Sequence, residues 1–301
     1  MNDFFKITSI SELHRHLGYS KPEHPLISVL DLSKVENTDY LADKKIVTSY
    51  YSVYLKTGGS SIKYGRKHYD FEEGSVITMA PEQVFSFSSD EDLDNLSGWV
   101  LYFHPDLIRK YPLAKRIEQF GFFSYEINEA LHLSDKERTT ITSIFQKITE
   151  EYELNIDEFS HDVLVTNVEL LLNYILRYYK RQFITRTTVN SDLLSDFEIL
   201  IKEYFQSEQL EVNGLPKVSW FADKLNLSSS YLSDMLKKET GKNLQEQIHY
   251  YVIEKSKNIL LNSTLTVSEI SYQLGFEYPQ YFSRLFKNKT GMSPNQYRIL
   301  N

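Results

Sequence analysis

The feature that most constrains the fold is an internal repeat in the last third of this 301-residue chain. The segment VSWFADKLNL at 218–227 is similar to VSEISYQLGF at 267–276, and YLSDMLKKETG at 231–241 is similar to YFSRLFKNKTG at 281–291. The offset is 49 residues before the turn and 50 residues after it, so the second copy has one extra turn residue. Self-similarity of this kind marks a repeated supersecondary unit. Each copy predicts a short helix, a turn and a longer helix, which is the order of a helix-turn-helix unit.

In both copies, apolar residues at i, i+3 and i+4 predict one buried face on the longer helix. These residues are Leu232, Met235 and Leu236 in the first copy, and Phe282, Leu285 and Phe286 in the second. Gly241 and Gly291 follow, at the position where a glycine commonly ends a helix. Between the copies, residues 244–261 predict one connecting helix about 27 Å long.

The outer faces of the two longer helices carry Gln, Ser, Arg and Lys side chains, whose donors suit base edges and phosphates in a major groove. Two helices that read one face of B-DNA lie about 34 Å apart, a separation that the connecting helix can hold. We therefore expect double-stranded DNA as the partner, bound at two adjacent major-groove segments. The alternative is a helical bundle without DNA contact. The predicted DNA contacts are Ser229, Ser230, Ser233, Asp234, Lys237, Lys238, Gln280, Ser283, Arg284, Lys287 and Arg298.

The segment TVSEISYQLGFEYPQYFSRLFKNKTGMSPNQYR at 266–298 resembles the signature region of the AraC/XylS family of transcriptional regulators. The resemblance extends from near Leu194 to the end of the chain, and it implies a sequence-specific DNA-binding regulator. It places Gln280, Ser283 and Arg284 of the second copy, and Ser230, Ser233 and Asp234 of the first, at positions that face DNA, with Lys237 near phosphate. The sequence departs from the family pattern at two positions. Asp234 is acidic, so it could pair with Lys237 or Lys238 one turn on instead of with DNA, and Val252 replaces a frequent arginine.

The first hundred residues form short runs rich in Val, Ile, Tyr and Phe, separated by turn signals, and this spacing favours a β-sandwich or barrel. Helical periodicity begins later, with the capping-box pattern S-x-x-E at Ser134. The family resemblance implies a cupin-like β-barrel with a helical dimerisation element ahead of the DNA-binding domain. The expected fold class is thus α+β, ending in an all-α domain of two helix-turn-helix units and their linking helix. The expected domains are 1–181, a linker at 182–190 that lacks apolar periodicity, and 191–301.

A helix expected at 158–181 carries an a/d pattern, the spacing of a helix seam. Its members are Leu164, Val168, Leu171, Ile175 and Tyr178, and a neighbouring stripe holds Val165, Leu172, Leu176 and Tyr179. We expect one stripe to pack on the barrel and the a/d stripe to meet a partner subunit in a homodimer. The alternative is a helix that is buried within its own domain.

Aromatic residues are frequent in the strand region, where they could line a small-molecule pocket or fill a core. The predicted ligand-binding residues are Tyr51, Tyr64, Phe85, Trp99 and Tyr102. A small-molecule effector is therefore expected as a second partner. In the rival hypothesis the barrel binds no ligand and is only a dimerisation or protein-interaction module.

Other functions lack the residues that they need. The chain has no cysteine, which excludes disulfides, thiol catalysis and Cys-ligated zinc. The strand region holds no pair of histidines followed by a carboxylate, so we expect no metal, no cofactor and no enzymatic activity, against the alternative of a cupin-type enzyme with a helical appendage. No apolar run of about 18 residues predicts a membrane span. We expect a cytoplasmic protein, since the first residues also lack a signal-peptide pattern.

The net charge of −8 at first argues against nucleic acid as a partner. From Ser191 on, however, the chain holds 12 of the 33 basic and 13 of the 41 acidic residues, a net charge of −1. The remaining −7 belongs to the first part of the chain. Between Tyr278 and Arg298 there are four basic residues and no acidic one. We therefore expect weak non-specific DNA binding and a need for dimerisation to reach tight occupancy.

Overall fold

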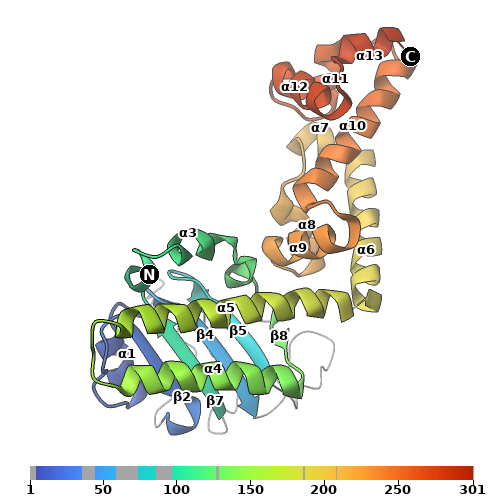
Figure 1. Cartoon of the computed structure of the whole chain (residues 1–301). Helices are drawn as coiled ribbons and strands as arrows, with labels where there is room; N and C mark the ends of the chain where they lie inside the picture. Colours follow the sequence, from blue (N-terminus) through green and yellow to red (C-terminus); the bar gives the residue numbers. More distant parts are fainter. Residues whose placement is uncertain are drawn as a thin grey trace. The chain divides into compact units, whose positions relative to one another are not determined.

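The computed structural model describes residues 5–35, 45–58, 74–85, 97–126, 129–185, 187–207 and 209–300. The chain forms two compact units, Met1–Thr185 and Arg186–Asn301. The first is a mixed unit of β-sheets and helices, and the second is helical (Figure 1). None of the described helices is both long enough and apolar enough to cross a bilayer.

Two sheets build the first unit. The larger sheet is antiparallel, and its strands lie in the order β2 (Ile27–Asp31), β7 (Ser97–Phe103), β4 (Tyr51–Gly58), β5 (Ser75–Met79) and β8 (Leu131–His132). The smaller sheet places β3 (Ile46–Thr48) between β1 (Phe5–Ile7), which is parallel to it, and β6 (Val84–Phe85), which is antiparallel. The predicted strand region is therefore confirmed. Within the described ranges, no strand pairing joins the two sheets into a closed barrel.

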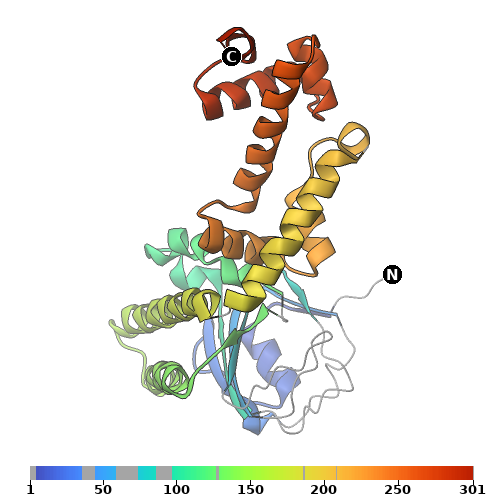
Figure 2. The ribbon, with the colours of Figure 1, turned by 90° about the vertical axis from the view of Figure 1, so that its right-hand side faces the viewer.

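Helices cover both faces of the larger sheet. Helices α4 (Asp135–Glu153) and α5 (Ser160–Thr185) lie side by side over one face, and α1 (Ile10–Leu17) lies on the other (Figures 1 and 2). The predicted capping box begins α4: Ser134 accepts from the backbone of Glu137, whose carboxylate accepts from the Ser134 N–H. For the larger sheet, we call the face that packs against α4 and α5 its outer face and the face that packs against α1 its inner face.

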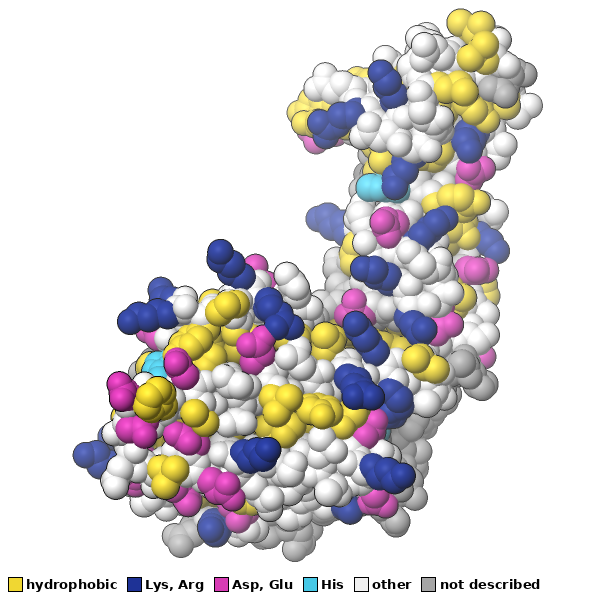
Figure 3. All heavy atoms as spheres, viewed as in Figure 1, with side chains coloured by type: hydrophobic (Ala, Val, Ile, Leu, Met, Phe, Trp, Pro, Cys, Tyr) yellow, Lys and Arg dark blue, Asp and Glu magenta, His cyan; other side chains and the backbone are white. Residues whose placement is uncertain are grey.

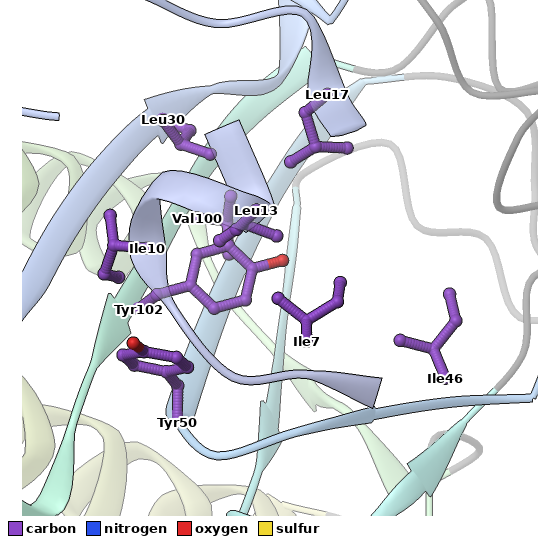
Figure 4. Packing of buried hydrophobic residues seen from close by; sticks show 9 residues of the cluster. All are labelled: Ile7, Ile10, Leu13, Leu17, Leu30, Ile46, Tyr50, Val100 and Tyr102. Carbon is purple, nitrogen blue, oxygen red and sulfur yellow. The ribbon is translucent and has the colours of Figure 1, made fainter. Parts of the chain in front are cut away.

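Helix α1 reaches the inner face because its apolar residues stand three and four positions apart, on one stripe. The stripe packs with apolar residues of the strands and of the smaller sheet (Figure 4). The members of this cluster are Ile7, Ile10, Leu13, Leu17, Leu30, Ile46, Tyr50, Val100 and Tyr102. Full burial of one such aliphatic side chain contributes about 1.5–3 kcal/mol.

Short elements complete the first unit. They are η1 (Leu32–Lys34), α2 (Pro105–Ile108), α3 (Leu113–Arg116), η3 (Ile117–Gln119) and η4 (Gly121–Ser124).

The boundary between the two compact units lies within the linker predicted at 182–190, but the residues on both sides of this boundary are helical. Helix α5 continues to Thr185, and α6 (Thr187–Gln206) begins two residues later. Tertiary contacts explain the continuation of α5, because Gln182 and Phe183 are buried. The Gln182 side chain accepts from the backbone N–H of His132 at 2.7 Å and donates to the Ala130 carbonyl at 3.2 Å. Gln182 is buried because it bonds to the backbone next to β8, and a polar residue buried in this way does not contribute to the apolar periodicity that marks a helix in the sequence.

The second unit contains the predicted repeat. Its helices are α6, α7 (Gln209–Asn213), α8 (Val218–Leu225), α9 (Ser229–Thr240), α10 (Leu244–Asn262), α11 (Val267–Gln273), α12 (Pro279–Thr290) and α13 (Pro294–Leu300). The two copies are α8–α9 and α11–α12, and α10 is the predicted connecting helix. Gly241 and Gly291 end α9 and α12 in the left-handed conformation, as expected.

Candidate nucleic-acid interface

The longer helix of each copy is anchored by its inner stripe. Leu232, Met235 and Leu236 of α9 are fully buried. On α12, Phe282 and Phe286 are fully buried with ring centroids 5.8 Å apart, whereas Leu285 is half-buried. The predicted inner faces are therefore confirmed, and they fix which side chains of each helix point outward.

The outer face of α12 is open to solvent. Gln280, Arg284 and Lys287 are exposed, and Ser283 is half-buried. Long, polar and positively charged side chains thus alternate with a short hydroxyl along one helical face. Such a face can donate to the O6 and N7 atoms of guanine and to phosphate oxygens.

The outer face of α9 is different in character. Ser229, Ser230, Ser233 and Asp234 are all half-buried, and of the predicted contacts on this helix Lys237 and Lys238, near its end, are the exposed ones. Short side chains with one carboxylate offer less reach toward base edges than the side chains of α12. The two copies share a fold but present unequal chemistry.

An aromatic pair, which the predicted contacts did not include, occupies the first turn of α12. Tyr278 precedes the helix and Tyr281 lies in its first turn, with ring centroids 5.7 Å apart in an edge-to-face arrangement. The Arg284 guanidinium carbon lies 5.8 Å from the centre of the Tyr281 ring, within cation–π range. The repeat had matched Tyr281 to Tyr231, which suggested a shared structural role. The i, i+3 spacing of Tyr281 and Arg284 could have revealed the pair.

Arg298 is the predicted DNA contact that the structure places elsewhere. It is half-buried, and its guanidinium donates to the carbonyl of Leu260 at 3.0 Å and to that of Leu265 at 2.6 Å. These carbonyls lie at the end of α10 and in the turn after it, where helix geometry leaves acceptors without partners. Arg298 therefore ties α13 to α10, and we remove it from the expected DNA contacts.

The connecting helix is a core element. Val252, which stands where the resembling family often has arginine, is fully buried, as are Ser256 and Leu260. The Lys255 ammonium donates to the Phe205 carbonyl at the end of α6. This helix therefore packs on both copies through its apolar residues and leaves Val252 no access to DNA.

A close contact between two glycines joins the segment before the first copy to the second copy. Gly214 follows α7, and Gly275 lies in the turn after α11; both have positive φ, +72° and +78°. A Cβ atom on Gly275 would lie 2.7 Å from the Gly214 Cα and 2.7 Å from the Leu210 carbonyl oxygen. The Tyr204 hydroxyl donates to the Gly214 carbonyl at 2.9 Å. The backbone after α7 thus packs directly on the turn of the second copy.

Of the predicted ligand-binding residues, Tyr51, Trp99 and Tyr102 are described, and they do not share one face of the sheet. The strand register pairs Tyr51 with Phe103 and Leu55 with Trp99, so Tyr51 and Trp99 lie on the outer face. Tyr51 stacks on Phe103 there, with centroids 5.1 Å apart. Tyr102 lies on the inner face, among the residues around α1. Tyr64 and the side chain of Phe85 lie outside the described residues.

The inner face carries two hydrogen-bonded polar groups of side chains that the sequence did not predict as pairs. The His14 ring lies between the Ser20 carbonyl, 2.5 Å from Nδ1, and the Ser28 hydroxyl, 2.8 Å from Nε2. Since the carbonyl can only accept, Nδ1 carries the proton and Nε2 accepts from Ser28. Burial lowers the pKa of His14, which favours this neutral form. The hydroxyls of Tyr54 and Tyr102 bond to each other, and burial raises the pKa of Tyr54 to about 12.

The dimerisation stripe is also corrected. Its five residues are Leu164, Val168, Leu171, Ile175 and Tyr178, and all are buried within the first unit. The neighbouring Val165, Leu172 and Tyr179 are buried as well. Leu176 of that neighbouring stripe is half-buried. Helix α5 packs against both α4 and the sheet, so the a/d stripe is covered within the first unit and is not presented to a partner subunit. This is the alternative in which the helix is buried in its own domain.

The described residues contain no group of three or more His, Asp or Glu side chains that could hold a metal ion.

Comparison with known proteins identifies both parts of the chain. Residues 221–299 match a helix-turn-helix domain model, and residues 47–164 match the model of an AraC-like ligand binding domain. The Xylose operon regulatory protein of Escherichia coli is 34% identical over 85 residues, which are 28% of this chain and 22% of that protein. The chain therefore matches about a fifth of the length of this relative.

Two further matches differ in extent. The uncharacterized HTH-type transcriptional regulator YfiF of Bacillus subtilis is 22% identical over 259 residues, which are 84% of this chain and 77% of that protein. A solved structure, the C-terminal domain of the two-component response regulator yesN from Fusobacterium nucleatum, has 34% sequence identity. The match covers 36% of this chain and 98% of the chain in that structure, with a TM-score of 0.32.

Proposed function

The chain belongs to the AraC family of transcriptional regulators, and from this premise we propose that it binds double-stranded DNA at two adjacent major-groove segments and regulates transcription there. The observation that carries the proposal is the repeated unit, in which the 12-residue helices α9 and α12 each bury one stripe and turn polar side chains outward. The family consists of transcription factors rather than enzymes, which answers the alternative of a cupin-type enzyme.

The proposed contacts divide by chemistry. Gln280, Ser283 and Arg284 on α12, and Ser229, Ser230, Ser233 and Asp234 on α9, are proposed to face base edges. Lys237, Lys238 and Lys287 are proposed to contact phosphates, because they are exposed near the ends of the two helices. Figure 3 shows Lys and Arg side chains recurring over the visible face of the second unit, with acidic side chains between them. This mixture agrees with its net charge near zero and with modest non-specific affinity.

Selection of binding sites from random duplex DNA with the full chain tests the proposal. A bipartite motif should be enriched, and Arg284→Ala should weaken binding to it by about 1–3 kcal/mol while relaxing the preference at one base pair. Lys287→Ala should weaken binding to all sequences and flatten the salt dependence. Lys180→Ala, which removes an exposed lysine of the first unit, is the control. Enrichment of no motif would refute the proposal.

For the first unit we propose a cupin-like barrel that binds a small-molecule effector and supports a homodimer. The AraC-like ligand binding match and the polar inner face of the sheet support the effector. We propose the dimer because the nearly neutral second unit should bind DNA weakly as a single copy. An effector should raise the melting temperature of the protein, whereas a mere protein-interaction module should not respond to any small molecule. Sedimentation measures the dimer. As a regulator of transcription that acts on DNA, the protein is proposed to be cytoplasmic.

A further inference from the structure

Tyr281 holds an exposed aromatic ring on the part of α12 that is best placed to meet DNA. The side chain is 51% exposed, whereas Tyr231, at the equivalent position of the first copy, is 4% exposed. In helix-turn-helix proteins the N-terminal residues of the second helix contact base edges. Tyr281 is the third residue of α12 and directly follows Gln280. The repeat therefore carries one tyrosine as a core residue in α9 and presents the other to solvent in α12.

The surroundings of Tyr281 give its ring a defined orientation. Tyr278 packs edge-to-face on it, and the Arg284 guanidinium lies over it at 5.8 Å. A cation above an exposed ring is attracted by the electron-rich face of the ring. This attraction, about 0.5–1 kcal/mol at an exposed site, favours those Arg284 rotamers that lie over the ring. A pre-positioned arginine loses less side-chain entropy when it binds.

We propose that Tyr281 is a specificity-determining residue of this regulator, whose ring packs on the C5-methyl group of a thymine while it positions Arg284 on an adjacent guanine. The inference rests on the proposed DNA-binding function. The thymine methyl is the apolar group that the major groove presents, and guanine offers the O6 and N7 acceptors that arginine binds with two hydrogen bonds. The Tyr281 ring and the Arg284 guanidinium lie side by side, so they can contact a thymine methyl and a guanine edge on adjacent base pairs.

A protein partner fits this surface less well. The exposed aromatic cluster consists of the Tyr278 and Tyr281 rings, while a standard protein interface takes about 800 Å² from each partner. Gln280, Arg284 and Lys287 of α12 are exposed polar and basic residues, and Glu277, directly before Tyr278, is exposed as well, so basic side chains outnumber acidic ones in this segment. This charge suits the edge of a DNA groove.

The two half-sites should therefore differ. Helix α9 has Ser233 and Asp234 where α12 has Ser283 and Arg284, and its tyrosine is buried. The segment read by α12 should show the stronger base preference, with one thymine–guanine step at its centre. The segment read by α9 should be more permissive.

The test begins with the bipartite site selected by the wild-type full chain. Each thymine of the α12 segment is replaced in turn by deoxyuridine, which removes only the methyl group. Wild type should lose about fourfold in affinity at one thymine, as expected for one buried methyl group. Tyr281→Ala should bind the original site more weakly and show no further loss with deoxyuridine there. It should also lose preference for the neighbouring guanine, because Arg284 is no longer held.

Two matched variants complete the experiment. Tyr281→Phe keeps the ring and should behave as wild type, which separates ring packing from hydroxyl bonding. Tyr250→Ala removes another exposed tyrosine, 48% exposed with the Lys242 ammonium 4.1 Å from its ring centre, but one that lies on the connecting helix. It should leave the deoxyuridine effect unchanged. If wild type binds its site specifically and Tyr281→Ala retains the same deoxyuridine and guanine profiles, the inference is overturned while the proposed function stands. If wild type selects no site, the proposed function fails first.

Discussion

Replacing Gly275 by alanine should destabilise the second unit more than the same change at Gly291. The new Cβ of Gly275→Ala would lie 2.7 Å from the Gly214 Cα, 2.7 Å from the Leu210 carbonyl oxygen and 2.8 Å from the Gly214 carbonyl carbon. All three atoms belong to the backbone, so no flexible side chain can move aside. Gly291 has nearly the same φ, +80° against +78°, but an added Cβ there would meet nothing within 4 Å.

The comparison separates two costs. Both variants force alanine into the left-handed region, at about 1–2 kcal/mol each. Only Gly275→Ala adds steric overlap, for which about 1–3 kcal/mol is typical in packed interiors. Gly275→Ala should therefore lose about 1–3 kcal/mol more stability than Gly291→Ala. With a urea dependence of about 2 kcal/mol per M, the midpoint should differ by about 0.5–1.5 M.

Tryptophan fluorescence can follow the second unit by itself. The chain has two tryptophans, Trp99 in the first unit and Trp220 in α8, so a Trp99→Phe background leaves one reporter. Trp220 belongs to the first copy of the repeat and Gly275 to the second. A shift seen at Trp220 therefore also shows that the copies unfold together. Equal midpoints for Gly275→Ala and Gly291→Ala would refute the reasoning, because the contact with α7 would then cost nothing to displace.

Three other predictions follow from buried groups. Arg298→Ala should lower the free energy of unfolding in urea by about 1–3 kcal/mol, because two carbonyls lose a charged donor. Unlike Lys287→Ala, it should leave the salt dependence of DNA binding unchanged, and a flatter salt dependence would show that Arg298 contacts DNA. The buried Ser271 hydroxyl has no hydrogen-bond partner among the described residues, so Ser271→Ala should be neutral or stabilise by up to about 1 kcal/mol, and a clear loss of stability would contradict this. Burial lowers the pKa of His14 below 6.5, so protonation favours the unfolded chain and the melting temperature of the first unit should fall as the pH drops below 6.5. The fall should be less steep in His14→Gln, and equal slopes of melting temperature against pH in the two proteins would contradict this.

Local patterns predicted the parts of the fold that depend on local physics. The inner stripes of α9 and α12, the glycines at their ends and the Ser134 capping box follow from helix periodicity and unsatisfied backbone groups, so the sequence was sufficient. The strand pattern likewise located the larger sheet. The family resemblance then pointed to function before any geometry was known.

Tertiary contacts decided the parts that the sequence did not predict. The seam on α5 had the correct spacing, but a helix covered by both α4 and a sheet buries two stripes, and periodicity cannot show how many neighbours a helix has. Arg298 has the same charge whether it meets phosphate or two carbonyls. Trp99 and Tyr102 offered a missed signal, since residues three apart on one strand lie on opposite faces of a sheet.

The contact between Gly214 and Gly275 should help a nearly neutral second unit to bind DNA. A net charge of −1 from Ser191 on gives little electrostatic attraction to any single DNA segment. The two DNA-contacting helices, α9 and α12, are held together by α10 and by the backbone after α7. This connection compensates for the weak attraction to each segment, because binding of the first segment makes binding of the second intramolecular. The gain depends on the two helices keeping one fixed separation. Gly275→Ala should therefore weaken binding to a two-segment site far more than binding to an isolated α12 segment, whereas Gly291→Ala should weaken both by the same factor.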